Sequence, residues 1–357
     1  VADLISASSW AADYLTRHPL LLDDLLDPRA LEAAPDWVLF HGELAASLDA
    51  IEPDTERQMD LMREAHHSQV FRLLTQDLAG LLTVERLADH LSKLADIMLE
   101  LTISAVWRKL RQRHRDAPRF AVVSYGKLGG KELGYASDLD IVFLFEDDDP
   151  NAQEIYSRLT QRMNTWLSSA TPAGTLFETD LRLRPNGDAG LLVSSLEAFR
   201  KYQMEAAWVW EHQALTRARF SAGDADIGAA FEAIRIDVLR KQRDLVELRE
   251  EVLAMRQRMI DNYTNRSGLF DLKHDRGGLI DVEFIVQFLV LGHSHDHPRL
   301  TGNLGNIALL GIAGELGLIP PDLALEVRDA YREYRRLQHG LRLNGAQYAR
   351  VDADSIA

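Results

Sequence analysis

The chain has 357 residues, 46% of them hydrophobic, which is enough for two or three domains with a sizeable core. Its formal net charge of -15 makes it a poor candidate for nonspecific binding to nucleic acid, which requires a basic surface. It has no cysteine, which excludes disulfides, thiolate catalysis and cysteine-ligated zinc. The sequence has neither an apolar run near the ~18 residues of a membrane span nor a signal peptide, so we expect a cytoplasmic protein with no membrane partner.

Residues 1–115 are predicted to be helical throughout, and prolines at positions 19, 28 and 35 indicate several short helices at the start. Two apolar stripes at helical spacing are predicted to pack in the core. The first consists of Leu73, Leu74, Leu78 and Leu81, and the second of Leu94, Ile97, Met98, Leu101 and Ala105.

The pattern changes after Pro118, where short β-branched and aromatic runs predict strands at 120–126 and 138–145. Residues 153–170 return to a helical period. Residues 175–184 then alternate between apolar and polar side chains, which predicts a third strand with one polar face.

The last part of the chain, 226–357, is predicted to form a helical bundle. Its expected helices cover 227–260, 279–291, 306–316 and 323–343. We therefore expect an α+β fold that is mostly helical, in which a small sheet domain at 116–225 lies between an N-terminal helical segment, 1–115, and the bundle.

Two aspartates, Asp138 and Asp140, are the strongest candidates for chemistry. They are two residues apart on a predicted strand, so both face the same side and repel unless a cation lies between them. Oxygen donors of this kind suit Mg²⁺, and Asp180 is the natural third ligand because its strand also has a polar face. Such a triad can hold two metal ions roughly 3.5–4 Å apart. A lone pair of aspartates is usually a solvated strand end, but a third carboxylate and a nearby Gly-Gly turn favour the metal site.

The residues around the pair are candidates for binding a nucleotide. Gly129 and Gly130 allow close backbone approach and are expected to expose N–H groups that could cradle a triphosphate. Ser137 is expected either to orient a phosphate or to cap the turn. Four cations are candidates for neutralising phosphate oxygens: Lys127, Lys131, Arg182 and Arg184.

These residues resemble the nucleotidyltransferase fold typified by polymerase β, and within it the glutamine synthetase adenylyltransferase family of bacterial nitrogen regulation. The likeness covers nearly the whole chain. Four blocks carry it in order: YGKLGGKELGYASDLDIVFLF, GTLFETDLRLRPNGDAGLLVSSLEAF, EAAWVWEHQALTRARF and FDLKHDRGGLIDVEFIVQFLVL. The forms WEHQALTRAR and RPNGDAGLLVSS resemble the C-terminal, adenylylating half of that family. Residues 8–28 resemble the helical segment between the halves, so we expect the C-terminal fragment of a longer protein.

The resemblance implies that a tyrosine hydroxyl of glutamine synthetase attacks the α-phosphate of ATP and that pyrophosphate leaves. It makes Asp138, Asp140 and Asp180 the metal ligands, with two Mg²⁺ ions, and the Gly129–Gly130 turn the triphosphate site. It also implies regulation by the PII signal protein and by glutamine. Two alternatives stay open. One is the half that removes AMP with phosphate; the other is a regulatory module with a decayed site that binds PII or glutamine.

Two further segments contain candidate residues. In 273–284, Lys273, Asp275, Asp281 and Glu283 are either nucleotide-side residues or part of interdomain packing and helix capping. The second set is expected on one helix, which either faces the cleft or only packs within the fold, and consists of Glu211, Gln213, Arg217 and Arg219. Three tryptophans are predicted to be core residues: Trp166, Trp208 and Trp210.

Overall fold

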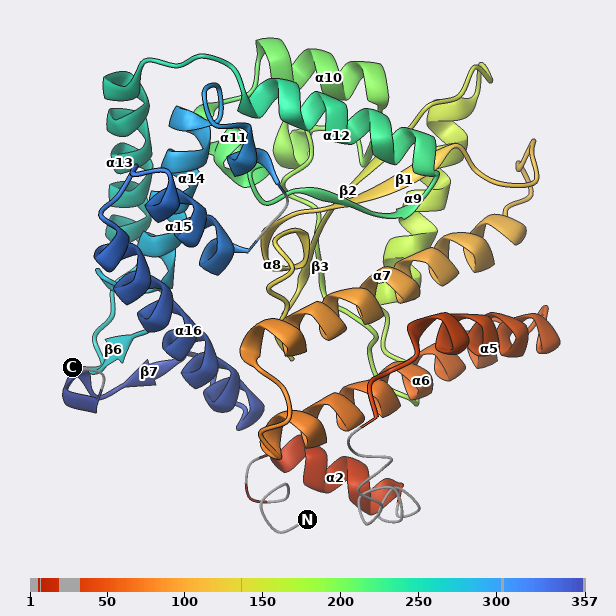
Figure 1. Cartoon of the computed structure of the whole chain (residues 1–357). Coiled ribbons are helices and arrows are strands. Elements are labelled where there is room, and N and C mark those ends of the chain that lie inside the picture. The colour runs from red at the N-terminus through yellow and green to blue at the C-terminus, as the bar shows by residue number, and fades with distance from the viewer. Residues whose placement is uncertain (1–5, 7, 19–32, 136, 303–304, 356–357) are drawn as a thin grey trace. The chain divides into compact units, whose positions relative to one another are not determined.

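The computed structural model describes residues 6, 8–18, 33–135, 137–302 and 305–355 (Figure 1). By contacts the chain forms two compact units, which are described separately. Unit 1 consists of 1–202 and 219–232, and unit 2 of 203–218 and 233–357. The architecture is α+β and mostly helical, as predicted. The three-part division at residues 115 and 225 stays a prediction.

The N-terminal part of unit 1 is helical, as expected, in its described residues. Its helices are α2 (Ser9–Arg17), α5 (Trp37–Ala50), α6 (Thr55–Leu78) and α7 (Val84–Arg108). All five residues of the second apolar stripe are buried in α7. The first stripe is only half right, because Leu73 and Leu74 are buried whereas Leu78 and Leu81, at the end of α6 and beyond it, are exposed. The expected helix breaks at Pro19 and Pro28 lie outside the described residues.

A five-stranded mixed sheet follows. Its strands are β1 (Phe120–Ser124), β2 (Leu139–Phe145), β3 (Thr179–Asp180), β4 (Val193–Ser195) and β5 (Arg219–Gly223). The order is β3-β2-β1-β5, with β4 also paired to β2. β1 runs antiparallel to β2 and β5, whereas β3 and β4 run parallel to β2. The two strands predicted at 120–126 and 138–145 are thus confirmed.

The third predicted strand, 175–184, is wrong in length, because only Thr179 and Asp180 pair with β2. Further along β2, the edge from Phe143 to Phe145 is taken by β4. The chain also turns soon after Asp180, where the N–H of Gly187 donates to the carbonyl of Arg184 at 2.8 Å. Alternation in the sequence therefore extended beyond the segment that has a partner strand.

Helices pack against this sheet to form the core of unit 1. α9 (Ala152–Ser168) contacts β3, β4 and α7, and α7 contacts β5. Figure 1 shows α5 and α6 on the side of α7 that faces away from the sheet. Stacked rings fill the space between strands and helices, with Tyr156 of α9 between Trp107 and Phe120. The core thus fixes the strands whose ends carry the aspartates.

Unit 2 is a helical bundle with a small two-stranded sheet. It contains α11 (Val209–Leu215), α13 (Leu245–Asn262), α14 (Leu279–His293), α15 (Asn306–Glu315), α16 (Pro321–Leu343), and the antiparallel pair β6 (Phe270–Asp271) and β7 (Arg350–Val351). α10 (Leu196–Glu205) and α12 (Ala225–Leu239) are each divided between the units. The single helix predicted at 227–260 is instead α12 and α13, because Asp244 caps a new start by accepting from the N–H groups of Val246 and Glu247. No helix in the described part of the chain is long and apolar enough to cross a bilayer.

Candidate metal and nucleotide site

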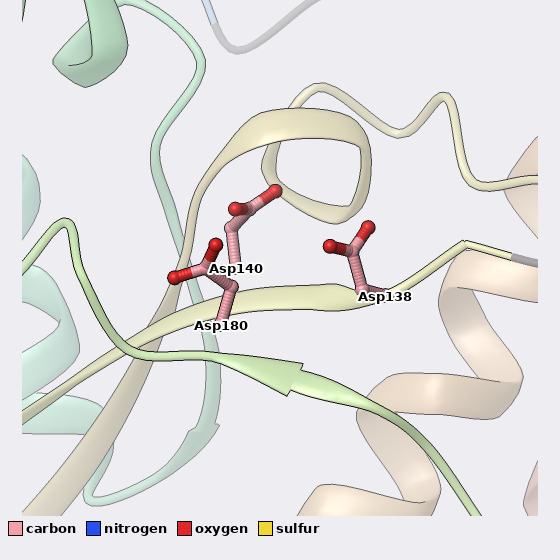
Figure 2. A group of neighbouring side chains, drawn as sticks. All are labelled: Asp138, Asp140 and Asp180. Carbon is pink, nitrogen blue, oxygen red and sulfur yellow. The ribbon is translucent and has the colours of Figure 1, made fainter.

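Three carboxylates converge at the start of β2 (Figure 2). Asp138 immediately precedes β2, Asp140 lies on it, and Asp180 lies opposite Asp140 in the parallel pairing of β3. Each carboxylate offers an oxygen that lies within 4.8 Å of the oxygens offered by the other two. On β2, the neighbours of Asp140 in the sequence, Leu139 and Ile141, are fully buried, so side chains alternate between the two faces of the strand as the sequence predicts.

Gly126 makes room for the central carboxylate. It follows β1 with a φ of +54°, and a Cβ at this position would lie 2.1 Å from Oδ2 of Asp140. The same turn is held to β2 by a hydrogen bond of 2.8 Å from the N–H of Tyr125 to the carbonyl of Asp140. The sequence analysis missed this glycine, although a glycine directly after a short buried strand is a recognisable signal for close backbone approach.

The Gly-Gly turn differs from the expectation of exposed N–H groups. α8 (Gly126–Gly129) is a single helical turn, in which the N–H of Gly129 donates to Tyr125 at 2.8 Å. The N–H of Gly130 donates to the carbonyl of Gly126 at 3.0 Å. Both amides are therefore engaged inside the turn. Lys127 lies in α8, and Lys131 follows it with a φ of +53°.

Ser137 makes a capping contact. Its Oγ accepts a hydrogen bond of 3.1 Å from the N–H of Gly134, within the loop that leads to β2. Of the two roles expected for Ser137, the geometry supports the closing of this turn next to Asp138. A role in orienting a phosphate stays a prediction.

Arg182 and Arg184 have different partners. The guanidinium of Arg182 donates to both carboxylate oxygens of Asp180, with Nε at 3.0 and 2.9 Å from them. These hydrogen bonds are the main reason that the pKa of Asp180 lies below its usual value. Arg184 is buried and donates to the carbonyls of Leu181 at 2.7 Å and Gly190 at 3.3 Å, so it holds the loop after β3.

Two members of the triad, Asp138 and Asp180, line a polar cavity of about 430 Å³, and Asp140 lies beside them on β2. Its lining consists of Asp138, Asn164, Glu178, Thr179, Asp180, Leu181, Arg182, Arg184 and Asp188. Three carboxylates that meet in this way are an all-oxygen donor set, which fits Mg²⁺ better than a soft metal. The residues present therefore fit a divalent cation.

The other predicted site residues belong to unit 2 and are engaged within it. Asp281, in the first turn of α14, accepts from the N–H of Gly277 at 2.6 Å and pairs with Arg256. Glu283 pairs with the buried Arg217 at 2.9 Å. These contacts fit packing and capping, the structural interpretation that the sequence left open.

Two remaining predictions concern the segment around α11, and a third concerns Lys273, between β6 and α14. Glu211 is buried and accepts from the backbone N–H of Trp208 at 2.9 Å, as the cap of its own helix. The single helix expected to hold positions 211–219 was wrong, because α11 ends at Leu215 and Arg219 begins β5. Exposed Lys273 donates its backbone N–H to Asp271 at 3.0 Å.

The predicted burial of three tryptophans holds for one of them. Trp166 is buried in α9, whereas Trp208 and Trp210 are exposed. Trp208 is the N-cap residue of α11, and Trp210 lies in its first turn.

Comparison with known proteins shows similarity along nearly the whole chain. Residues 1–234 match the family model described as glutamate–ammonia ligase adenylyltransferase, and residues 247–352 match the model described as GlnD PII-uridylyltransferase. The relatives include proteins named bifunctional glutamine synthetase adenylyltransferase/adenylyl-removing enzyme. The one from Aromatoleum aromaticum is 70% identical over 97% of this chain and 37% of its own length. Those from Chromobacterium violaceum and Ralstonia nicotianae are 57% and 58% identical over 99% and 100% of this chain, and over 39% and 38% of their own lengths. The chain thus spans about two fifths of these relatives.

Proposed function

Because the chain belongs to the glutamate–ammonia ligase adenylyltransferase family, we propose that it transfers AMP from ATP to a tyrosine hydroxyl of glutamine synthetase. The observation that carries this proposal is the convergence of three carboxylates within 4.8 Å of one another beside an open polar cavity. The hydroxyl oxygen forms a bond to the α-phosphorus, the bond from that phosphorus to the β-phosphate breaks, and pyrophosphate leaves.

The residues of unit 1 have distinct roles in this proposal. Asp138, Asp140 and Asp180 would hold two Mg²⁺ ions, which neutralise the triphosphate and activate the attacking hydroxyl when bound. Asp140 is positioned by the ladder of β2 and by the turn at Gly126, and Asp180 by its pairing opposite Asp140. Transfer of this kind depends on positioning and charge neutralisation more than on a covalent enzyme intermediate, so it needs no serine or histidine nucleophile.

Two cations and the Gly-Gly turn are the proposed nucleotide-binding residues. Lys131 and Arg182 would neutralise phosphate oxygens, and the close turn through Gly129 and Gly130 would shape the rim of the site. The catalytic domain in this account covers 116–225, with the helical segments on either side of it. ATP and Mg²⁺ are the implied co-substrate and cofactor, and the cytoplasm is the implied location.

The relatives' printed name combines adenylyl transfer with adenylyl removal, and this chain spans only about two fifths of their length. The blocks WEHQALTRAR and RPNGDAGLLVSS resemble the adenylylating half, which supports transfer over removal. PII signal protein and glutamine are proposed regulators on the family resemblance alone. A purely regulatory role is less well supported, because such a module would not need three converging carboxylates.

The proposal is tested in both directions with one purified chain. In the first arm, the chain is incubated with Mg²⁺, ATP labelled at the α-phosphate, and unmodified glutamine synthetase. In the second, it is incubated with labelled, adenylylated glutamine synthetase and inorganic phosphate. We expect label to be incorporated in the first arm and none to be released as ADP in the second. Release without incorporation would instead support the removing activity, and neither reaction would support the regulatory module.

A further inference from the structure

Arg182 lines the cavity, and its guanidinium is bound to a member of the carboxylate triad, Asp180. Besides the two contacts of Nε, its own backbone N–H donates to Oδ1 of Asp180 at 2.9 Å, and a terminal guanidinium nitrogen contacts Oδ2. Both oxygens of Asp180 are thus occupied by one arginine from two residues away. A guanidinium fork and a metal ion both bind carboxylate oxygens, so the two compete for Asp180.

The pair is asymmetric in its exposure. The side chain of Asp180 is 16% exposed, whereas that of Arg182 is 74% exposed. An arginine so exposed contributes little packing, and ion pairs at a surface contribute little stability, so the guanidinium can leave at small cost. Arg184 is the opposite case, with a side chain only 10% exposed and a guanidinium that donates to two backbone carbonyls and pairs with Asp188 at 3.5 Å. Arg184 is therefore built into the loop, while Arg182 is free to exchange its partner.

Three carboxylates this close repel one another without a cation. We propose that Arg182 is an exchangeable counter-ion of Asp180, which occupies its oxygens before metal binds and moves to a phosphate when a divalent cation and a triphosphate arrive. This inference rests on the proposed nucleotidyl transfer site, and it adds a role that a simple phosphate-binding arginine would not have. Arg182 then lowers the affinity for metal alone and raises the affinity for metal with nucleotide.

Removing Arg182 should change two affinities in opposite directions, and this distinguishes an exchangeable counter-ion from a simple phosphate-binding arginine. Mn²⁺ binding to the whole chain is measured by calorimetry and by the loss of the free-ion signal in electron paramagnetic resonance. Binding of α,β-methylene-ATP, which is not cleaved at the α-phosphate, is measured with Mg²⁺ present. For Arg182→Gln we expect Mn²⁺ binding to become about five- to ten-fold tighter, because a competing ion pair and a nearby positive charge are both removed. The nucleotide analogue should bind several-fold more weakly.

Two further variants make the result specific. Arg158→Gln removes the same charge from an exposed ion pair with Glu154 on α9, so it should change neither affinity. Arg182→Lys keeps the charge but loses the fork, so its Mn²⁺ affinity should lie between those of the parent and Arg182→Gln.

The possible outcomes separate this inference from the proposed function. Equal or weaker Mn²⁺ binding by Arg182→Gln would overturn the counter-ion role while leaving the metal site intact. Tighter Mn²⁺ binding with unchanged nucleotide binding would refute the move to a phosphate. If neither the parent chain nor the variant bound Mn²⁺, the metal site itself, and with it the proposed function, would be overturned as well.

Discussion

Gly126→Ala is the substitution that most directly perturbs the site without removing a functional group. The new Cβ would lie 2.1 Å from Oδ2 of Asp140, whereas ordinary contact begins at 3.4 Å. The carboxylate oxygen must therefore move by about 1.3 Å, the difference between these two distances. Alanine also has to adopt a φ of +54°. Backbone strain of this kind costs roughly 1–2 kcal/mol in a residue with a Cβ.

The shift of Asp140 sets the expected size of the effect on activity. A misplacement of about 1 Å in a reacting site costs on the order of a hundred-fold in rate. We therefore expect Gly126→Ala to lower AMP incorporation into glutamine synthetase by about a hundred-fold. Mn²⁺ affinity should fall with it, because the same oxygen is a proposed metal ligand. Incorporation is followed with ATP labelled at the α-phosphate, and stability by thermal unfolding.

Gly80→Ala is the matched control. Gly80 also lies in unit 1 and has a φ of +72°, but a Cβ there would meet nothing within 4 Å. The control should lose a similar amount of stability and keep its activity and Mn²⁺ affinity. The reasoning would be refuted if Gly126→Ala kept activity within about three-fold of the parent, or if both variants lost activity equally.

Three more predictions concern contacts away from the carboxylates. Arg63 is buried and donates to four carbonyls, so Arg63→Met should lower the free energy of unfolding by about 3–5 kcal/mol. Arg57→Met, at an exposed ion pair, should leave the urea midpoint nearly unchanged, and similar midpoints for the two variants would contradict this. Burial lowers the pKa of His212 from 6.5 to about 4, so the unfolded chain gains the proton first as pH falls. Stability should drop by about 1.4 kcal/mol per pH unit from pH 6.5 towards 4, and a parent slope no steeper than that of His212→Gln over this range would argue against it. Glu283→Gln should lower thermal stability, because it weakens the pair with buried Arg217. The KM for ATP should stay unchanged. A raised KM at unchanged stability would instead show that Glu283 acts on the nucleotide.

Local patterns were enough to predict the centre of the site. Two short apolar runs around Phe120 and Ile141 have no helical period, and each became a strand buried on both faces. Asp138 and Asp140 share a face because side chains alternate on a strand, and this needed no tertiary information. Asp180 was found because it belongs to a second segment with a polar face, although only two residues of that segment are paired.

The rest depends on which segments become neighbours. The role of Gly126 follows from a contact with Asp140 that lies fourteen positions along the chain, across the β1–β2 pair. The length of β3 was overestimated because β4 competes for the edge of β2, and β4 is only three residues long. The partner of Arg182 was also missed, because a side chain that folds back onto Asp180 leaves no trace in the alternation of charges.

The amide groups of the Gly-Gly turn show a different limit. Glycines signal that a backbone can approach a ligand, but they do not tell where the N–H groups point. Here Gly129 and Gly130 continue one helical turn, so their N–H groups are used by Tyr125 and Gly126. The two glycines predict a tight turn, but the direction of their N–H groups is set by the helical conformation that the turn adopts.

AMP incorporation by Asp140→Asn tests the central claim most directly. This substitution keeps the shape of the side chain and removes the charge of the carboxylate that Gly126 accommodates. We expect incorporation of label from ATP into glutamine synthetase to fall by at least about a hundred-fold, with an unchanged unfolding temperature. Asp188→Asn, in the same cavity but outside the triad and with a side chain 79% exposed, should retain activity. Incorporation at the parent rate by a folded Asp140→Asn chain would contradict the assignment of this carboxylate cluster as the catalytic site.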